Sequence, residues 1–227
     1  MIKLRHYIFI NPHNVLSRKH KKLDFIKKIH LRNYNQGEII IYWFYEDILN
    51  LLQSYDKELA DLFSKINKMY PALLADIGRY IILYKFGGVY LDLKFLAKNE
   101  IYKLIYFTKK FNKNIQVIGW KHPNENRTRN GGIIALTKNN IFFHNVLQNI
   151  KKKLLEEKKE NKQINSSKMF YIGSKTYIDL FKIYEKQNKV AKFSFQKNIV
   201  KFNRKIYKLN FVRWQNTHQK LFEEEEN

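Results

Sequence analysis

The sequence predicts one α/β domain in which a mostly parallel β-sheet is flanked by helices. The 227 residues are enough for one sizeable hydrophobic core but short for two. Hydrophobic residues make up 44% of the chain, a share typical of globular proteins. Short apolar runs alternate with longer stretches of helical periodicity, which is the pattern of a parallel sheet with helices on its faces.

The first two strands are expected over residues 6–10 (HYIFI) and 38–45 (EIIIYWFY), each followed by helical sequence. From Glu46 to about Tyr70 the apolar residues recur at helical spacing, which predicts one helix. A second helix begins at Pro71, because proline suits a first helical turn, and a glycine pair follows it. Gly87 or Gly88 suits the left-handed cap that ends such a helix.

Three more strands follow the glycine pair, over residues 89–96 (VYLDLKFL), 114–120 (NIQVIGW) and 131–137 (GGIIALT). Residues 139–162 form an amphipathic helix whose Lys/Glu face is solvated and supported by i,i+4 pairs. We expect a single domain over residues 1–220. The last residues, 221–227 (LFEEEEN), are expected to form a frayed, disordered acidic tail.

The net charge of +23 raises the question of nucleic-acid binding. Most of the positive charge is lysine, whereas bidentate recognition of phosphate and guanine favours arginine. The chain is also rich in Lys, Asn and Ile, which indicates a compositional bias in its coding sequence. Nucleic acid is therefore not the expected partner, and a basic nucleic-acid-binding protein remains an alternative. The charge would attract any anionic substrate over long range.

The chain contains no cysteine, which excludes a disulfide scaffold and thiolate metal sites. No stretch reaches the 18 apolar residues or so that a membrane-spanning helix needs, and the first residues lack the features of a signal peptide. We expect a soluble or cytoplasmic protein without stable membrane insertion. Its basic surface could still hold it loosely at an anionic membrane.

The strand expected over residues 89–96 carries an acid and a lysine two residues apart. Side chains alternate faces along a strand, so Tyr90, Asp92 and Lys94 share one face, and the opposite face is wholly apolar. Just upstream, Asp76 and Arg79 are three residues apart on a helix and hence neighbours on its surface. A helix–turn–strand unit thus delivers two charged pairs to one small region. Taken alone, each pair also fits an ordinary surface ion pair or an edge strand.

Residues 73–95 (LLADIGRYIILYKFGGVYLDLKF) resemble the DXD sugar-binding region of a glycosyltransferase family. It is the family 32-like group of the yeast initiating α-1,6-mannosyltransferase and capsular polysaccharide enzymes. The matching positions are Ala75, Asp76, Arg79, Tyr80, Leu83, Tyr84, Gly87, Gly88, Tyr90 and Asp92. The resemblance implies a GT-A fold, which is Rossmann-like, with the donor bound beside the carboxyl ends of the strands.

The same resemblance implies the roles of the site residues. Asp76 would accept hydrogen bonds from donor sugar hydroxyls, and Arg79 would approach the sugar or the diphosphate. Asp92 would stand at the ribose and at a metal, with Tyr90 beside it in the donor site. Fainter similarity covers the strand that contains Asn130, an acceptor-side loop that contains Ser174, and a C-terminal segment that contains His218. These three residues are candidates for contacts with the acceptor or with phosphate.

The chain departs from the family pattern at Lys94, where the second acid of the motif is expected. In the family that acid binds a divalent cation, Mn²⁺ or Mg²⁺, which stabilises the departing nucleoside diphosphate. Asp92 and a protonated Lys94 sum to zero, as two aspartates and a divalent cation do. We therefore interpret Lys94 as taking the electrostatic role of the metal. Two alternatives stay open: a metal held by Asp92 and a distant ligand such as His218, or a site that has lost activity.

The expected function is transfer of a sugar from a UDP- or GDP-sugar to a hydroxyl acceptor, with retention of anomeric configuration. Asp76, Asp92 and Lys94 are the expected catalytic residues of this hexosyltransferase. The acceptor would be a glycan, a lipid-linked saccharide or a protein, so a role in polysaccharide or glycan biosynthesis is expected. A catalytically inactive homologue that binds a nucleotide-sugar is the second alternative.

Overall fold

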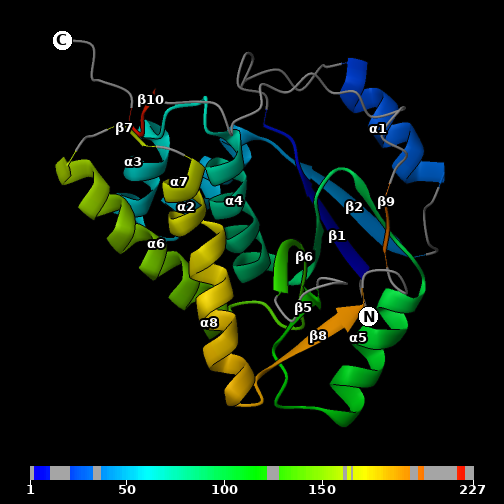
Figure 1. The fold of residues 1–227 in the computed structure, drawn as a ribbon. Helices are drawn as coiled ribbons and strands as arrows, with labels where there is room; N and C mark the ends of the chain where they lie inside the picture. Colours follow the sequence, from blue (N-terminus) through cyan, green and yellow to red (C-terminus); the bar gives the residue numbers. More distant parts are fainter. Residues whose placement is uncertain are drawn as a thin grey trace.

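The computed structural model describes residues 3–10, 21–32, 37–121, 128–160, 163–164, 166–194, 199–201 and 219–222. Its centre is a six-stranded sheet with the strand order β2-β1-β3-β6-β5-β8 (Figure 1). Five strands run in one direction and β6 runs against them, pairing antiparallel with β3 and β5. The strands are β1 (Lys3–Ile8), β2 (Glu38–Trp43), β3 (Gly88–Leu91), β5 (Val117–Lys121), β6 (Thr128–Ala135) and β8 (Val190–Ser194). The mostly parallel sheet of the prediction is confirmed.

Helices cover both faces of the sheet (Figure 1). One face carries α2 (Tyr45–Gln53), α3 (Lys57–Lys65), α4 (Pro71–Phe86), α6 (Ile141–Glu160), α7 (Ser166–Ile172) and α8 (Ser174–Lys186). The other face carries α1 (Lys21–Arg32) and α5 (Glu100–Phe111). Two short pairs lie outside the main sheet: β4 (Phe95–Ala97) with β9 (Ile199–Lys201), and β7 (Gln163–Ile164) with β10 (Gln219–Lys220).

The central helix α4 begins and ends as the sequence predicts. Pro71 occupies its first turn, and Gly87 ends it with φ 66°, donating its amide hydrogen to the Leu83 carbonyl at 3.0 Å. Side chains on nearly every side of α4 are buried, since the helix lies between the sheet and its neighbours α2 and α6. The helix therefore carries Asp76 and Arg79 into the interior rather than onto the surface.

Two predicted elements are interrupted in the structure. The helix expected from Glu46 to Tyr70 is two helices, α2 and α3, because Asp56 caps α3 by accepting a hydrogen bond from the Leu59 amide at 3.0 Å. The strand expected over residues 89–96 is also two, β3 and β4. The chain turns between them, and the Phe95 amide donates to the Asp92 carbonyl at 2.8 Å.

The end of the packed chain also differs from the prediction. Leu221 and Phe222 are buried, and the Asn67 amide donates to the Leu221 carbonyl at 2.7 Å. Both side chains are apolar, and both join the hydrophobic core. The tail expected over residues 221–227 therefore begins with two packed residues, and residues 223–227 lie outside the described part of the chain.

Among the helices that the structure describes, none combines the length and apolar character needed to cross a lipid bilayer.

Candidate active site

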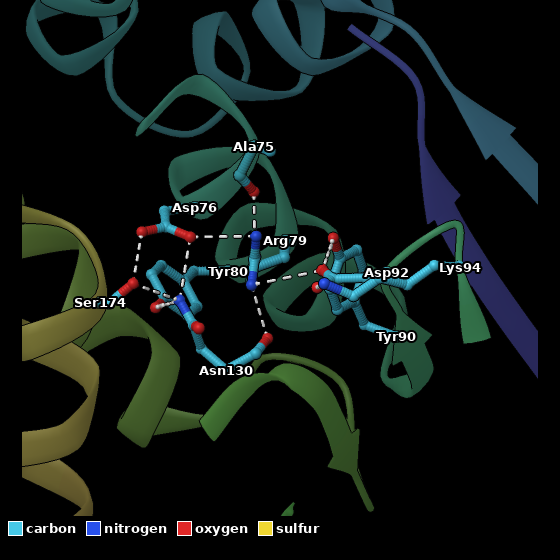
Figure 2. A network of polar contacts seen from close by, with 9 residues as sticks. All are labelled: Ala75, Asp76, Arg79, Tyr80, Tyr90, Asp92, Lys94, Asn130 and Ser174. Carbon is cyan, nitrogen blue, oxygen red and sulfur yellow. Dashed lines mark hydrogen bonds and ion pairs between the residues drawn. The ribbon is translucent and has the colours of Figure 1, made fainter. Parts of the chain in front are cut away.

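A polar network lies at the carboxyl edge of β3, where the first three parallel strands end (Figure 2). Helix α4 contributes Asp76 and Arg79, and Asp92 follows the last residue of β3. Strand β6 contributes Asn130, and the first residue of α8 is Ser174. Residues from four parts of the chain therefore converge on one edge of the sheet, the edge where open α/β sheets bind ligands.

Asp76 is the buried acid of this network, with only 10% of its side chain exposed. Its Oδ1 forms an ion pair with Arg79 Nη2 at 3.0 Å and accepts a hydrogen bond from Asn130 Nδ2 at 2.9 Å. Its Oδ2 accepts a hydrogen bond from Ser174 Oγ at 2.9 Å. Burial raises the pKa of Asp76, whereas Arg79 and the hydrogen bond from Ser174 lower it. The net effect is a pKa above the usual value, because burial outweighs the groups that donate to the carboxylate.

Arg79 connects the two acids of the network. Its Nε donates to the Ala75 carbonyl at 3.2 Å, and its Nη1 donates to the Asn130 carbonyl at 2.6 Å. Nη1 also lies 3.7 Å from Asp92 Oδ1, and the guanidinium lies over the Tyr90 ring, 4.8 Å from its centroid. A planar group with five donors suits this position between two carboxylates.

Asp92 and Lys94 form the solvent-facing side of the network. The Tyr90 hydroxyl donates to Asp92 Oδ1 at 3.0 Å, and Lys94 Nζ lies 3.8 Å from Asp92 Oδ2 (Figure 2). The side chain of Asp92 is 29% exposed and that of Lys94 is 46% exposed, against 7% for Arg79. A ligand entering from solvent would meet Asp92 and Lys94 first.

Two glycines leave room for the carboxylates. A Cβ on Gly173 would lie 2.3 Å from Asp76 Oδ2, and a Cβ on Gly131 would lie 2.7 Å from Asp92 Oδ2. Gly173 precedes the first residue of α8, so the Asp76 carboxylate sits at the amino-terminal end of that helix, where the helix dipole favours negative charge.

Side chains of β1 and α1 hold the turn that carries Asp92 and Lys94. The Tyr7 hydroxyl donates to the Phe95 carbonyl at 3.0 Å, and His30 Nε2 lies 3.2 Å from the Leu93 carbonyl oxygen. The His30 and Tyr7 rings are stacked, with centroids 3.9 Å apart. Burial lowers the pKa of His30 to about 4, so its ring is neutral at pH 7 and donates from Nε2 to Leu93.

The structure brings together most of the residues that the sequence singles out. Asp76, Arg79, Tyr90, Asp92 and Lys94 lie in one network, and Asn130 and Ser174 bind Asp76 directly. His218 lies outside the described residues.

The predicted site residues did not include Gly131, Gly173, Tyr7 and His30. The motifs NGG and IGS are local signals for the glycines, since glycine marks close approach of the backbone. Tyr7 and His30 reach the turn from distant segments, and nothing in the local sequence marks them.

Residues 23–111 match the family "Glycosyltransferase sugar-binding region containing DXD motif". The match includes Asp76, Arg79 and Asp92, which the structure joins in one network. The matched segment is less than half of the chain, and its family is one of glycosyltransferases. The chain is thus a glycosyltransferase, as the sequence predicts, and its activity class is transfer of a sugar from a nucleotide-sugar. No curated protein matches the chain.

Several solved structures are similar to this glycosyltransferase. "PaToxG Glycosyltransferase" has a TM-score of 0.50 and 17% identity, over 81% of this chain and 69% of that one. The UDP-bound glycosyltransferase domain of the YGT toxin has a TM-score of 0.46 and 10% identity, over 76% of this chain and 55% of that domain. Mouse xyloside xylosyltransferase 1 has a TM-score of 0.47 and 10% identity, over 85% of each chain. The likeness to PaToxG, together with the mixed sheet, shows the GT-A fold and nothing finer.

Glycosyltransferases with a DXD motif commonly use a divalent cation. In the part of the chain that the structure describes, no three His, Asp or Glu side chains gather as a metal site would require. Both oxygens of Asp76 already accept hydrogen bonds, and an ammonium stands beside Asp92 where the family has a second acid. A hard cation prefers several oxygen ligands, and among the described residues of this network Asp92 is the one partly exposed carboxylate. The described side chains of this network therefore do not supply, by themselves, the ligands that a divalent cation needs.

Proposed function

We propose that this glycosyltransferase moves a hexose from a UDP- or GDP-sugar to a hydroxyl group, with retention of anomeric configuration. The acceptor is a glycan, a lipid-linked saccharide or a protein. The observation that carries the proposal is the Arg79 guanidinium, which lies 3.0 Å from Asp76 and 3.7 Å from Asp92 and so ties α4 to the end of β3. Such a rigid polar edge can fix both ends of a nucleotide-sugar.

In this proposal each acid has its own place on the donor. Asp76 and Arg79 contact the donor sugar, while Asp92 contacts the ribose of the nucleotide. Tyr90 orients Asp92 through its hydroxyl group, at 3.0 Å from Oδ1. Asn130 and Ser174 hold Asp76 through hydrogen bonds of 2.9 Å each and line the acceptor side of the same edge.

Lys94 faces the β-phosphate of the donor in place of a metal. Counting charges supports this role: Asp76 and Asp92 are balanced by Arg79 and Lys94, so the cluster is neutral. With an acid at position 94, as in the family pattern, the same cluster would carry a charge of −2 and would need a divalent cation. An ammonium 46% exposed to solvent remains free to approach an incoming phosphate.

The proposed step conserves atoms and charge. The bond between the anomeric carbon and the β-phosphate oxygen breaks, and its electron pair leaves with the nucleoside diphosphate. The acceptor oxygen forms the new bond on the same face of the sugar, and its proton passes to the departing phosphate. Lys94 stabilises the negative charge that develops on that phosphate.

The test is a panel of UDP- and GDP-sugars, each added with Mn²⁺ and with chelator. Thermal unfolding reports donor binding, because a ligand bound only to the folded state raises the melting temperature, and release of UDP or GDP reports turnover. We expect one nucleotide class to stabilise the protein and to be hydrolysed, and both effects to persist in chelator.

Three other results would favour the alternatives to this proposal. Loss of turnover in chelator would assign the role to a metal and remove it from Lys94. Donor binding without turnover, with every acceptor offered, would favour an inactive binding homologue. Stabilisation by oligonucleotides and by no nucleotide-sugar would overturn the proposal.

A further inference from the structure

Helix α5 exposes a cluster of aromatic side chains. Tyr106, Phe107 and Phe111 leave 54%, 53% and 66% of their surface open to solvent. The rings touch in sequence, with centroids 5.6 Å apart for Tyr106 and Phe107 and 6.2 Å apart for Phe107 and Phe111. Single exposed apolar residues are ordinary, but a joined cluster of three aromatic rings marks an interaction surface.

Lysines surround this aromatic cluster. Residues 100–114, which comprise α5 and the turn after it, contain four lysines and one acid, Glu100. Lys110 Nζ lies 5.9 Å from the centroid of the Tyr106 ring and 5.2 Å from that of Phe111. The remaining lysines of the segment are exposed as well: Lys103, Lys109 and Lys113. The outer side of α5 is therefore both aromatic and cationic.

A cavity of about 130 Å³ lies beside α5, at the amino ends of β1 and β3. The charged side chains that line it are Lys3, Lys109 and Lys138, and no acid lines it among the described residues. Pockets for drug-sized ligands run from roughly 300 to 1,000 Å³, so this cavity suits a group of the size of a phosphate. Lys109 lines the cavity and lies on α5, so the same helix carries one wall of the cavity and the aromatic cluster.

We infer that this surface docks on a membrane that contains anionic phospholipids. Phe107 and Phe111 enter the boundary between headgroups and acyl chains, and the lysines of α5 face the anionic headgroups. The cavity lined by Lys3, Lys109 and Lys138 takes the phosphate of one headgroup. Lipid fits better than nucleic acid because two of the three rings are phenyl groups and the cations are all lysine, without the arginine fork that reads phosphate and bases.

The docking surface and the donor site lie at opposite edges of the sheet. Gly88, at the start of β3, lines the cavity, whereas Asp92 follows the end of that strand. Four residues of extended chain separate them by roughly 13 Å, at about 3.3 Å per residue. Membrane contact through α5 leaves the carboxyl edge open, so the inference does not depend on the transfer reaction.

The test is co-sedimentation of the full chain with vesicles of phosphatidylcholine alone and of phosphatidylcholine mixed with phosphatidylserine. The protein should bind only the anionic vesicles. The double variants Phe107→Ala/Phe111→Ala and Lys109→Ala/Lys138→Ala should each weaken that binding about tenfold or more. Both should keep the wild-type melting temperature within a few degrees, since these side chains are exposed.

Matched controls separate this surface from general charge. Phe25→Ala removes a ring that is 47% exposed on α1, and Lys182→Ala/Lys186→Ala removes two exposed lysines from α8. Both controls should bind vesicles as the wild type does. Equal loss in the lysine control, or full binding by the Phe107/Phe111 variant, would overturn the inference. Single-stranded RNA that binds more tightly through the same residues, or stabilisation by inorganic phosphate without vesicle binding, would overturn it too.

Discussion

Replacing Lys94 tests whether its positive charge takes the electrostatic role of a divalent cation at the donor phosphate. The ammonium lies 3.8 Å from Asp92 Oδ2 and is 46% exposed. Two unit charges about 4 Å apart interact by about 4 kcal/mol near a protein surface and by about 1 kcal/mol in bulk water. A half-exposed lysine beside a phosphate lies between these limits, at about 2 kcal/mol. Lys94→Ala should therefore lower kcat/KM for donor hydrolysis about 30-fold.

A second variant, Lys94→Asp, restores the acid of the family pattern. It should have little activity in chelator and should regain activity when Mn²⁺ is added, because two carboxylates then offer oxygen ligands to a hard cation. Lys182→Ala, an exposed lysine on α8, is the matched control and should behave as the wild type.

The assay measures released UDP or GDP, with Mn²⁺ and with chelator, for the wild type and each variant. Full activity of Lys94→Ala in chelator would refute the electrostatic role of Lys94. Loss of wild-type activity in chelator would refute it as well.

Three further changes test the surroundings of the site. Gly131→Ala places a Cβ 2.7 Å from Asp92 Oδ2, so the carboxylate must move. Donor hydrolysis should then fall at least about tenfold. Unchanged hydrolysis would show that the position of the carboxylate is unimportant. Asn130→Ala removes a donor from buried Asp76 and should lower the free energy of unfolding by about 1–3 kcal/mol in urea titrations, whereas no change would mean that water replaces the amide. His30 has a folded pKa of about 4, below its unfolded value of about 6.5, so its contribution to stability is complete above pH 6.5 and is lost as the pH falls towards 4. Urea titrations at several pH values should show that His30→Gln removes about 3 kcal/mol of this pH dependence, and an unaltered pH profile would contradict the assignment.

The elements with strong local signals could be predicted from the sequence. Pro71 begins α4 and the glycine pair follows its end, and the 16 residues from Pro71 to Phe86 form one helix. The direction of most strands followed from their alternation with helices. Strand β6 runs antiparallel to β5 because only six residues separate the two strands, whereas a parallel crossover needs about a dozen or more. The pairing of Asp76 with Arg79 followed from helical spacing alone.

The contacts that complete the site depend on packing between distant segments. Asn130 and Ser174 were candidates for acceptor or phosphate contacts, and their hydrogen bonds to Asp76 join residues 54 and 98 positions apart. Periodicity describes one element at a time, so it cannot show which side chains meet across a sheet edge. The same limit applies to the break after Leu91, since the apolar and polar alternation continues to Phe95 although the backbone turns.

That break explains how Lys94 comes to face Asp92. In a continuous strand, residues two apart on one face have Cα atoms roughly 6.6 Å apart, and their side chains project in parallel. The turn closed by the Phe95 amide and the Asp92 carbonyl lets Lys94 Nζ fold back to 3.8 Å from Asp92 Oδ2. Tyr7 and His30 hold the turn through the Phe95 and Leu93 carbonyls. A lysine at this position can therefore occupy the place of a cation because the first strand and α1 fix the backbone that carries it.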